Sequence, residues 1–548
     1  MTFPITQADF YKLSHKKFMH ESTEFLYANF TPRSAKYAKW LDNSDQKTVF
    51  FGLQHFIQDF LIDEFNKDFF EKSKETVIIK LKRRCDAALG PDAISMEHFE
   101  ALHDLGYLPI CIKALDEGLR VPFKVPMLTI FNTHKDFAWL VTYLETVMSC
   151  ELWQPITSAT TAFEYRKLCE KYAALTVGNN LHVPFQCHDF SFRGMAGRHA
   201  AAISGAAHLL SFTGTDTASA IDLLEDFYGA NVDVEFIAGS VPASEHSVTS
   251  LGSSVDGEFD TIKKWITQDY PTGIVSVVSD TYDYWRVLTE YLPILKQDIL
   301  SRKKNALGLS KVVVRPDSGN PVHIICGYKI IEENILWNTP LYVISDEEYE
   351  IVHTNTGKYH LLKESYDSYG YIDQRTLGEE ISEAEALGSI EMLWNIFGGT
   401  ISNNGYKVID SHIGLIYGDS ITLDRAKEIF ERLETKGFAS SNVVLGVGSF
   451  TYQMVSRDTL GMAMKATYAV VDNAPRNLFK DPVTDDGTKK SARGLLHVSV
   501  DENGEFKLLD ETTPLEESTG CLQIVFKDGK LYKMHTLKEM RERLSSYL

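Results

Sequence analysis

Short runs of apolar residues, many of them β-branched, recur along the middle of the chain and alternate with helix-like segments. They lie at 273–278, 311–314, 413–417 and 442–447. Apolar strands without strict alternation are typical of a parallel sheet that helices cover on both faces. The region from about 155 to 450 is therefore predicted to fold as an α/β unit.

The last two runs flank a segment whose pattern predicts a helix. Thr422 can cap its start, and Lys436-Gly437 can end it. The apolar residues between them recur at helical spacing: Ala426, Ile429, Phe430 and Leu433. With its flanking strands this helix makes a βαβ unit, which favours parallel pairing of the two strands.

The two ends of the chain mix helix and strand signals. Residues 50–70 predict a buried amphipathic helix. Near the C-terminus, 496–509 and 523–533 alternate around Asn-Gly and Asp-Gly pairs, which predicts two hairpins. Thr536 and Glu539 have the spacing of a capping box and predict a final helix.

An insertion interrupts the spacing of the strands. The distance from Asp317 to Asp419 is about 60 residues longer than the neighbouring strand-to-strand spacings. We place the extra segment at about 325–381, with a hairpin that turns at 355–357, and expect no catalytic residue in it. After it, a capping box at Ser382 predicts a helix that continues through Phe397.

Composition and charge narrow the function classes. Hydrophobic residues make up 44% and charged residues 24% of the 548 residues, as in ordinary globular proteins. The formal charge of −20 argues against a surface built for nucleic acid or anionic membranes, although a local basic pocket is compatible with it. We expect no membrane span and no signal peptide. The seven scattered cysteines indicate reduced thiols with no disulfide framework and no zinc site among them, and hence a cytoplasmic protein.

Polar and glycine residues follow the predicted strands. They include Ser279-Asp280, Arg315 to Gly319, Gly418-Asp419, Gly448-Ser449 and, earlier, 214–216 and 239–241. Turns use Asp and Gly for structural reasons, so any single motif has a simple explanation. Six such motifs in succession favour a site at the carboxyl ends of the strands of an α/β barrel.

Several of these motifs carry candidate binding groups. The ring of Phe190 can stack on a flat heterocycle, and Arg193 can hold a phosphate, although a packed phenylalanine and a surface arginine are the better explanation of this motif taken alone. Asp216 can accept a hydrogen bond from an amide, although a helix N-cap is an equally good explanation. Glu245-His246 can serve as a phosphate acceptor or acid/base pair, although a structural histidine is the commoner outcome.

Further groups suit a phosphorylated sugar. Carboxylates at adjacent strand ends suit ribose hydroxyls, and Arg or Mg²⁺ suits pyrophosphate oxygens. The candidates are Asp280, Asp283, Arg315, Asp317, Gly418, Asp419 and Ser449. The chain also has four scattered bases in or near these motifs, and scattered Lys and Arg are usually solvated surface: Arg33, Arg457, Lys465 and Lys480.

Taken together, the motifs closely resemble the nicotinate/nicotinamide phosphoribosyltransferase family, and the similarity covers most of the chain apart from the insertion. The motifs that carry it are DFYK (9–12), FTPR (30–33), HDFSFRG (188–194), FTGTDT (212–217), GSVPASEHS (239–247), VSVVSDTYD (275–283), VVRPDSGNP (313–321), IYGDSIT (416–422), SRD (456–458) and FKDPV (479–483). The chain departs from the pattern at Phe192, where vertebrate-type members carry tyrosine.

The resemblance implies an α/β fold, the α/β barrel of the type II phosphoribosyltransferases, at 156–455. It implies a second α+β domain built from 1–155 and 456–548. It also implies that nicotinamide attacks C1 of 5-phosphoribosyl 1-pyrophosphate, with Mg²⁺, to give nicotinamide mononucleotide and pyrophosphate. ATP would drive the reaction through a phosphohistidine, in a homodimer that shares its active sites.

The resemblance also implies residue roles. Phe190 and Tyr11 from the partner subunit would sandwich the pyridine ring, and Asp216 would accept from the carboxamide. His246, steadied by Glu245, would be the phosphorylated histidine. Asp280 and Asp317 would complete the catalytic set. Seven further residues would line the site or bind the substrate: Arg193, Ser240, Ser276, Arg315, Gly418, Asp419 and Ser449. Four bases would reach the phosphates from the partner chain: Arg33, Arg457, Lys465 and Lys480.

Three other functions can be compared with this one. A nicotinate-specific enzyme shares the fold, but a carboxylate at Asp216 disfavours an acidic substrate. A non-catalytic binding protein would have lost catalytic groups, whereas Asp280, Arg315, Asp317 and His246 are present. An aldolase needs a Schiff-base lysine at a strand end, and none of the strand-end motifs supplies one.

Overall fold

The apolar runs of the middle region form one parallel sheet of six strands in the computed structural model, in the order β7-β6-β17-β16-β9-β8. The strands are β6 (Cys187–Asp189), β7 (Gly214–Thr215), β8 (Gly273–Val278), β9 (Ser310–Arg315), β16 (Ile413–Tyr417) and β17 (Val443–Val447). The structure describes residues 3–42, 44–338, 349–369, 372–418, 420–484 and 490–548. All four predicted strands are confirmed.

One irregular segment joins the two edges of this sheet. Gly239 bridges to Gly214 in β7, and four residues later Ala243 bridges to Ser276 in β8, both in parallel. The backbone N–H of Ser276 donates to Pro242 at 2.9 Å, and that of Ser244 donates to Ser276 at 3.0 Å. The segment 239–244 therefore closes the sheet into a barrel, as the predicted fold class requires.

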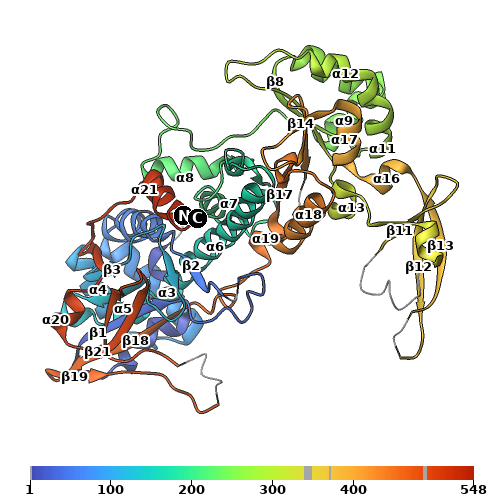
Figure 1. Ribbon diagram of the computed structural model, residues 1–548. Helices are drawn as coiled ribbons and strands as arrows, with labels where there is room; N and C mark the ends of the chain where they lie inside the picture. The colour runs from blue at the N-terminus through green and yellow to red at the C-terminus, as the bar shows by residue number, and fades with distance from the viewer. Residues whose placement is uncertain (1–2, 43, 339–348, 370–371, 419, 485–489) are drawn as a thin grey trace.

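Helices cover the outside of the barrel (Figure 1). They include α7 (Arg198–His208), α8 (Ser219–Tyr228), α9 (His246–Asp256), α10 (Glu258–Lys264), α12 (Leu292–Leu300), α13 (Pro321–Cys326), α17 (Ser389–Phe397), α18 (Leu423–Thr435) and α19 (Ser449–Gln453). The predicted helix is confirmed as α18: Thr422 Oγ1 accepts from the Arg425 N–H, and its four apolar residues are buried. In the described part of the chain, no helix has the length and apolar character needed to cross a membrane.

Strands from both ends of the chain form a second, antiparallel sheet, in the order β19-β18-β1-β5-β3-β22-β23. Figure 1 shows the blue N-terminal and red C-terminal segments together in this region. The strands are β1 (Thr23–Thr31), β3 (Ile110–Ala114), β5 (Leu128–Asn132), β18 (Ala463–Val471), β19 (Ala474–Asn477), β22 (Gln523–Lys527) and β23 (Lys530–Leu531). Both predicted hairpins are confirmed: β20 (Leu495–Val500) with β21 (Phe506–Thr512), and β22 with β23.

Helices of the terminal regions pack on this sheet, among them α3 (Lys74–Leu89), α4 (Glu97–Leu105) and α5 (Trp139–Tyr143). The final helix α21 (Leu537–Ser545) confirms the capping box at Thr536, and its buried residues pack with those of α7 and α8 instead. The predicted helix at 50–70 starts as α2 (Leu53–Phe56) and continues with π-helical hydrogen bonding from Ile57 to Phe70. Its phenylalanines at 56, 65 and 69 are buried in the core of this domain.

Helix α6 (Glu145–Thr176) links the two regions and passes through the boundary predicted at residue 155. Its first part, at Val147 and Leu152, packs in the core of the antiparallel domain. Its last part, at Tyr165 and Cys169, packs in the barrel core. The domain limits at 155 and 455 stay predictions, but one continuous helix belongs to both cores.

The insertion forms its own four-stranded sheet, in the order β10-β11-β12-β13. It consists of β10 (Ile330–Glu332), α14 (Glu333–Asn338), β11 (Ile351–His353), β12 (Tyr359–Tyr366) and β13 (Ile372–Ile381). The hairpin turning at 355–357 is confirmed. The capping box predicted at Ser382 is present, but the prediction of one helix through Phe397 is wrong. Gly388, at φ 81°, separates α16 (Glu383–Leu387) from α17.

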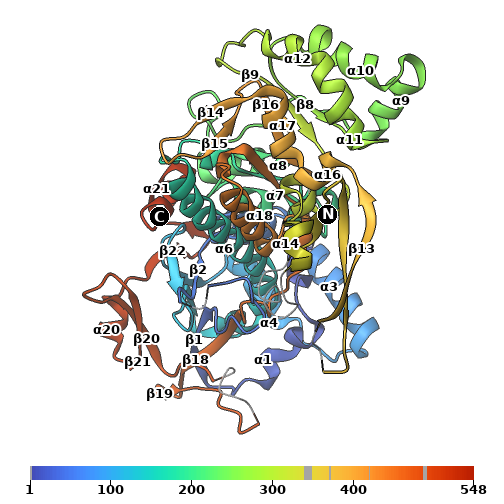
Figure 2. The ribbon, with the colours of Figure 1, turned by 45° about the vertical axis from the view of Figure 1, so that its right-hand side comes forward.

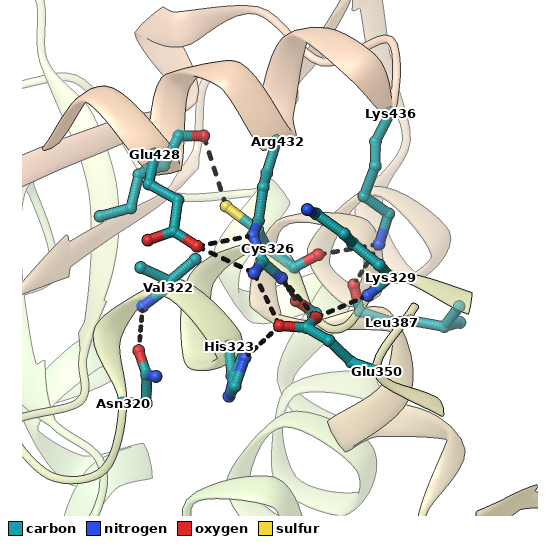
Figure 3. Close-up of polar contacts among 12 residues, drawn as sticks. Asn320, Val322, His323, Cys326, Lys329, Glu350, Leu387, Glu428, Arg432 and Lys436 are labelled. Atoms are coloured by element: carbon teal, nitrogen blue, oxygen red, sulfur yellow. Dashed lines mark hydrogen bonds and ion pairs between the residues drawn. The ribbon is translucent and has the colours of Figure 1, made fainter. Parts of the chain in front are cut away.

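Glu350 fastens the insertion to the barrel (Figure 3). The Arg432 guanidinium, on α18, donates to both of its carboxylate oxygens, at 2.6 and 2.7 Å. His323 of α13 and the Lys329 N–H contact the same carboxylate at 3.0 and 2.8 Å. Burial alone would raise the pKa of Glu350, but the hydrogen bonds from His323 and Arg432 and the Arg432 charge hold it well below its ordinary value.

We predict that Glu350→Gln loosens the insertion. Loss of the paired charge costs about 1–3 kcal/mol locally, so amides of β10 to β13 should exchange roughly tenfold faster or more at neutral pH. The pKa of Glu350 is lower in the folded protein than in the unfolded chain, where it is near 4.3. The stabilisation from the Glu350 contacts is therefore complete above that pH and is lost as pH falls below it. Hydrogen exchange should therefore show the two proteins converging at low pH.

The matched control is Glu380→Gln, which breaks the exposed pair of Glu380 with Lys358 on the same sheet. Exposed pairs contribute little, so this variant should exchange like the wild type. Equal protection in Glu350→Gln and wild type at neutral pH would contradict the anchoring role.

Candidate active site

A cleft of about 640 Å³ opens at the carboxyl ends of the barrel strands. Eight of the residues that the sequence singles out line it: Phe190, Arg193, Asp216, Glu245, His246, Arg315, Asp317 and Gly418. They come from the ends of four strands, β6, β7, β9 and β16, and from the chain that continues the segment closing the barrel. Barrel topology, rather than proximity in the sequence, therefore assembles the site.

A buried carboxylate fixes the loop that carries Phe190 and Arg193. Asp189, at the end of β6, accepts from the Ser191 N–H at 2.9 Å and from the Thr217 hydroxyl at 2.7 Å. It is fully buried. These bonds tie the end of β6 to the end of β7, and thus set the position of Phe190 relative to the polar groups that follow β7.

Asp216 lies in the cleft with two donors on one of its oxygens. His188 Nε2 lies 2.9 Å and Ser240 Oγ 2.5 Å from Oδ1. Burial alone would raise the pKa of Asp216, but the His188 contact, Ser240 and the Arg315 charge lower it, so the carboxylate is ionised at neutral pH. Oδ2 can then accept from a ligand that donates a hydrogen bond.

His246 is the first residue of α9 and faces two carboxylates. Its Nε2 lies 3.7 Å from Asp280 Oδ1 and 4.0 Å from Asp317 Oδ2, and its Nδ1 lies 3.1 Å from Thr281 Oγ1. The side chain is half-exposed. A helix start favours negative charge, which suits a residue that meets a phosphate.

The structure places Glu245 differently from the expectation that it steadies His246. Its carboxylate accepts from the Ser247 hydroxyl, and the contact to the His246 ring comes from Thr281. Glu245 is the N-cap residue of α9 and has extended backbone, so its side chain leaves the chain in a different direction from that of its neighbour. Adjacency in sequence is therefore not contact here.

Asp280 and Asp317 are linked through backbone and hydroxyl. Asp280 Oδ2 accepts from the Asp317 N–H at 2.8 Å and from Ser318 Oγ at 2.6 Å. Asp280 Oδ1 is buried and has no hydrogen-bond partner among the described residues. Such an oxygen needs a donor or a cation, and the cleft is where one can reach it.

Close backbone packing limits the site on its other side. A Cβ added to Gly418 would lie 2.1 Å from Asp317 Oδ1, so only glycine lets this carboxylate approach the strand end. A Cβ on Gly194 would meet Ser449 Oγ at 1.9 Å, which places Ser449 against the Arg193 loop. Asp419 lies outside the described residues.

Two predicted site residues, Arg315 and Ser276, contact the segment 239–244 that closes the barrel. The Arg315 guanidinium donates to the Ser244 carbonyl at 2.5 Å. Ser276 is buried in β8, and its backbone pairs with the closing segment, whereas its hydroxyl has no partner among the described residues. Ser276 is thus placed beneath the cleft rather than in its lining.

The basic candidates gather elsewhere. Arg33 and Lys465 line a pocket of about 210 Å³ in the antiparallel domain, together with Lys124 and Lys490. Burial lowers the pKa of Lys465; Arg33 and Lys480 lower it further, and Glu145 opposes them. A lysine held among other cations is a site that an anion would stabilise.

This basic pocket and the barrel cleft share no lining residue. The strands beside the pocket, β1 and β18, and the helix beside the cleft, α9, lie at opposite ends of the folded chain in both views (Figure 2). Tyr11 and Arg457 are likewise absent from the cleft lining and are exposed, at 59% and about half.

Comparison with known proteins identifies the family. A family model described as "Nicotinate phosphoribosyltransferase (NAPRTase) family" matches residues 185–513. The chain is 49% identical over 545 residues to the nicotinamide phosphoribosyltransferase of Acinetobacter baylyi, covering 100% of this chain and 97% of that protein. The chain belongs to the nicotinate phosphoribosyltransferase family. It is also 30% identical over 506 residues to the nicotinamide phosphoribosyltransferase of Mycoplasma genitalium, with 89% and 93% coverage.

Membership in the nicotinate phosphoribosyltransferase family makes the protein a pentosyltransferase enzyme. A solved structure supports the fold: the nicotinate-nucleotide pyrophosphorylase of Pyrococcus furiosus aligns with a TM-score of 0.52 at 14% identity, over 99% of this chain and 95% of that chain. The fold expected from the sequence, an α/β-barrel phosphoribosyltransferase with an α+β domain, is thereby confirmed.

Sequence reasoning missed several groups that shape this site. His188 contacts Asp216, Thr281 contacts His246, and Ser318 contacts Asp280. Each lies within or next to a motif that the sequence singled out, so the motifs themselves were the available signal. Which member of a motif points into the cleft depends on strand and turn geometry, which spacing alone does not define.

Proposed function

We propose that the protein is a nicotinamide phosphoribosyltransferase, which joins nicotinamide to 5-phosphoribosyl 1-pyrophosphate and releases pyrophosphate. The observation that carries this proposal is Asp216, an ionised carboxylate in the cleft lining beside Phe190. An amide NH₂ can donate to it, whereas the carboxylate of nicotinate would be repelled. The names of the two relatives support the same substrate.

The charges of the cleft suit glycosyl transfer. As pyrophosphate leaves C1, positive charge develops on the ribose, and the carboxylates of Asp280 and Asp317 can stabilise it. Arg315 is held by the Ser244 carbonyl at the edge of the same cleft and can balance phosphate charge. The aromatic ring of Phe190 favours the product, because nicotinamide becomes a pyridinium cation.

The residues present fit a magnesium ion as an added component. Asp280 Oδ1 is a buried carboxylate oxygen without a hydrogen-bond partner among the described residues. The Asp317 carboxylate faces the same point, because Asp280 Oδ1 and Asp317 Oδ2 lie 3.7 and 4.0 Å from the same atom, His246 Nε2. Mg²⁺ commonly binds through one or two carboxylates together with substrate phosphates. When bound, it would neutralise the pyrophosphate that leaves.

The position of His246 supports a phosphohistidine. The ring is half-exposed at the start of an eleven-residue helix, where a phosphoryl group would be favoured. ATP would transfer its γ-phosphoryl group to a ring nitrogen and leave as ADP, and water would later hydrolyse the N–P bond. Asp280 and Asp317 beside the ring would make this adduct sensitive to the substrates that share the cleft.

A homodimer would unite the two halves of the binding machinery. The cleft holds ring- and ribose-binding groups, whereas Arg33, Lys465 and Lys480 gather at the other end of the protomer. A two-fold dimer in which the basic pocket of one copy faces the cleft of the other would form two equivalent composite sites. The phosphates would then be bound by the partner subunit, and Tyr11 would be available from there as the second aromatic face.

We predict that purified protein forms nicotinamide mononucleotide from nicotinamide and 5-phosphoribosyl 1-pyrophosphate, and that Asp216→Asn lowers its preference for nicotinamide over nicotinate at least about tenfold. Removal of the negative charge relieves repulsion of the acid and adds a donor for it. The measurement is kcat/KM for both substrates by chromatography of the nucleotide product.

The control is Asp222→Asn, an exposed aspartate on α8 that follows the same strand end. It should keep the wild-type preference. An unchanged preference in Asp216→Asn would remove this account of selectivity, and folded wild-type protein that yields no product would overturn the proposed function.

We predict that two inactive variants complement each other. Asp317→Asn removes a group of the cleft, and Arg33→Ala removes a group of the basic pocket. The homodimer of either variant therefore has no complete site. When both chains are co-expressed with different tags, half of the dimers are mixed, and each has one intact site, so activity should return to about a quarter of wild type. Activity of the purified mixed dimer no higher than that of either variant would contradict shared sites.

We predict that His246→Ala abolishes ATP hydrolysis and stimulation by ATP while slow, ATP-independent product formation survives. The ring is the proposed acceptor, and its removal leaves Asp216, Arg315 and Asp317 in place. His412→Gln, which changes a histidine paired with Asp410 at 2.8 Å outside the cleft, is the control. Equal ATP stimulation of His246→Ala and wild type would exclude the phosphohistidine.

A further inference from the structure

A cluster of metal-binding side chains lies outside the cleft, where α2, α6 and α7 meet. One ligand atom each of His55, Asp59 and His199 lies within 4.8 Å of the others. His55 and Asp59 are four residues apart on one helical run, and His199 is the second residue of α7. None of them lines the cleft or the basic pocket.

Two of the three side chains in the cluster have no hydrogen-bond partner among the described residues. They are the His55 ring, which is only 5% exposed, and the Asp59 carboxylate. Buried or half-buried groups of this kind normally have a partner, so their convergence on one point indicates a missing ligand.

Glu151 adds the feature that distinguishes a metal ligand from a solvated histidine. Its carboxylate, on α6, lies 2.8 Å from His199 Nε2. Histidines that bind metals commonly have such a carboxylate on the ring, which fixes the tautomer and the ring orientation. The rings of His199 and His55 are 5.0 Å apart, with Phe227 packed edge-on against His55 at 4.6 Å.

We propose that His55, Asp59 and His199 form a binding site for a divalent transition cation of the Zn²⁺ type, with Glu151 as the residue that positions His199. Two imidazoles and one carboxylate match the donor set of three-ligand zinc sites, whose fourth position is taken by water. Hard cations such as Mg²⁺ and Ca²⁺ prefer oxygen donors and would be poor occupants.

The fit requires only small side-chain movements. Ligand atoms of a tetrahedral zinc ion are about 3.4 Å apart, so atoms within 4.8 Å must approach by roughly 1.4 Å or less. His199 is exposed and Asp59 half-buried, so both can adjust and admit the ion, while the buried His55 ring provides a fixed point.

The site would join the two domains close to the active cleft. His55 and Asp59 belong to the helical run whose phenylalanines lie in the antiparallel domain, and His199 follows Arg193 by six residues along the barrel chain. A bound ion would therefore fix the start of α7, next to the loop that presents Phe190 and Arg193. This proposal does not depend on the proposed function, because it concerns binding alone.

The test is cobalt binding to the chelator-treated full-length protein, followed by competition with Zn²⁺. Tetrahedral Co²⁺ has intense visible absorption, so titration reports the affinity, the stoichiometry and the geometry. We expect one tight ion per chain in the wild type, displaced by Zn²⁺ but not by Mg²⁺. His199→Gln and Asp59→Asn should lose the tight site, and Glu151→Gln should bind about 10–100-fold more weakly.

Two variants distinguish this site from other histidines. His412→Gln and His246→Ala should both retain the wild-type spectrum and affinity, since neither residue belongs to the cluster. Since His199 is exposed, His199→Gln should fold normally, and its melting temperature without metal provides the check. Absence of a tetrahedral cobalt spectrum in the wild type would overturn the proposal, as would an unchanged spectrum in His199→Gln and Asp59→Asn.

Discussion

Closure of the barrel by the segment 239–244 is the constraint on which the site depends. Backbone bridges at Gly239 and Ala243 join the two edge strands β7 and β8. The same few residues supply the Ser240 hydroxyl to Asp216 and the Ser244 carbonyl to Arg315, and they lead directly into His246. A sheet left open here would still have every motif, but Asp216, Arg315 and His246 would not share a cleft.

The sequence predicts much of this fold because its signals are local. The buried faces of the strands and of α18, the caps at Thr422 and Thr536 and the hairpin turns depend on residues close in the chain. The closing segment has no strand-like pattern, so its role follows only from long-range pairing. The break at Gly388 was missed because the apolar pattern continues across it, while the glycine adopts φ 81°.

The site was predictable as a set of motifs and not as a set of contacts. Phe190, Asp216, His246, Asp317 and Gly418 all reach one cleft, as parallel strand ends require. The partner of each side chain depends on directions that sequence does not specify, which is why Thr281 rather than Glu245 contacts the histidine ring. The split between cleft and basic pocket could not be derived from spacing at all, because it is a property of the folded protomer.

The continuity of α6 has a mechanical consequence. A helix of 32 residues is about 48 Å long, and this one is embedded in the core of each domain, so it ties the two cores together. Pro155 lies inside it and has no N–H to donate, so a bend between the domains would be concentrated there. Bending at other points would require breaking backbone hydrogen bonds or exposing one of the two cores. The distance between the cleft and the basic pocket is therefore set largely by this one helix. In the proposed dimer, the width of a chamber formed by both copies would change mainly through movement of one subunit against the other.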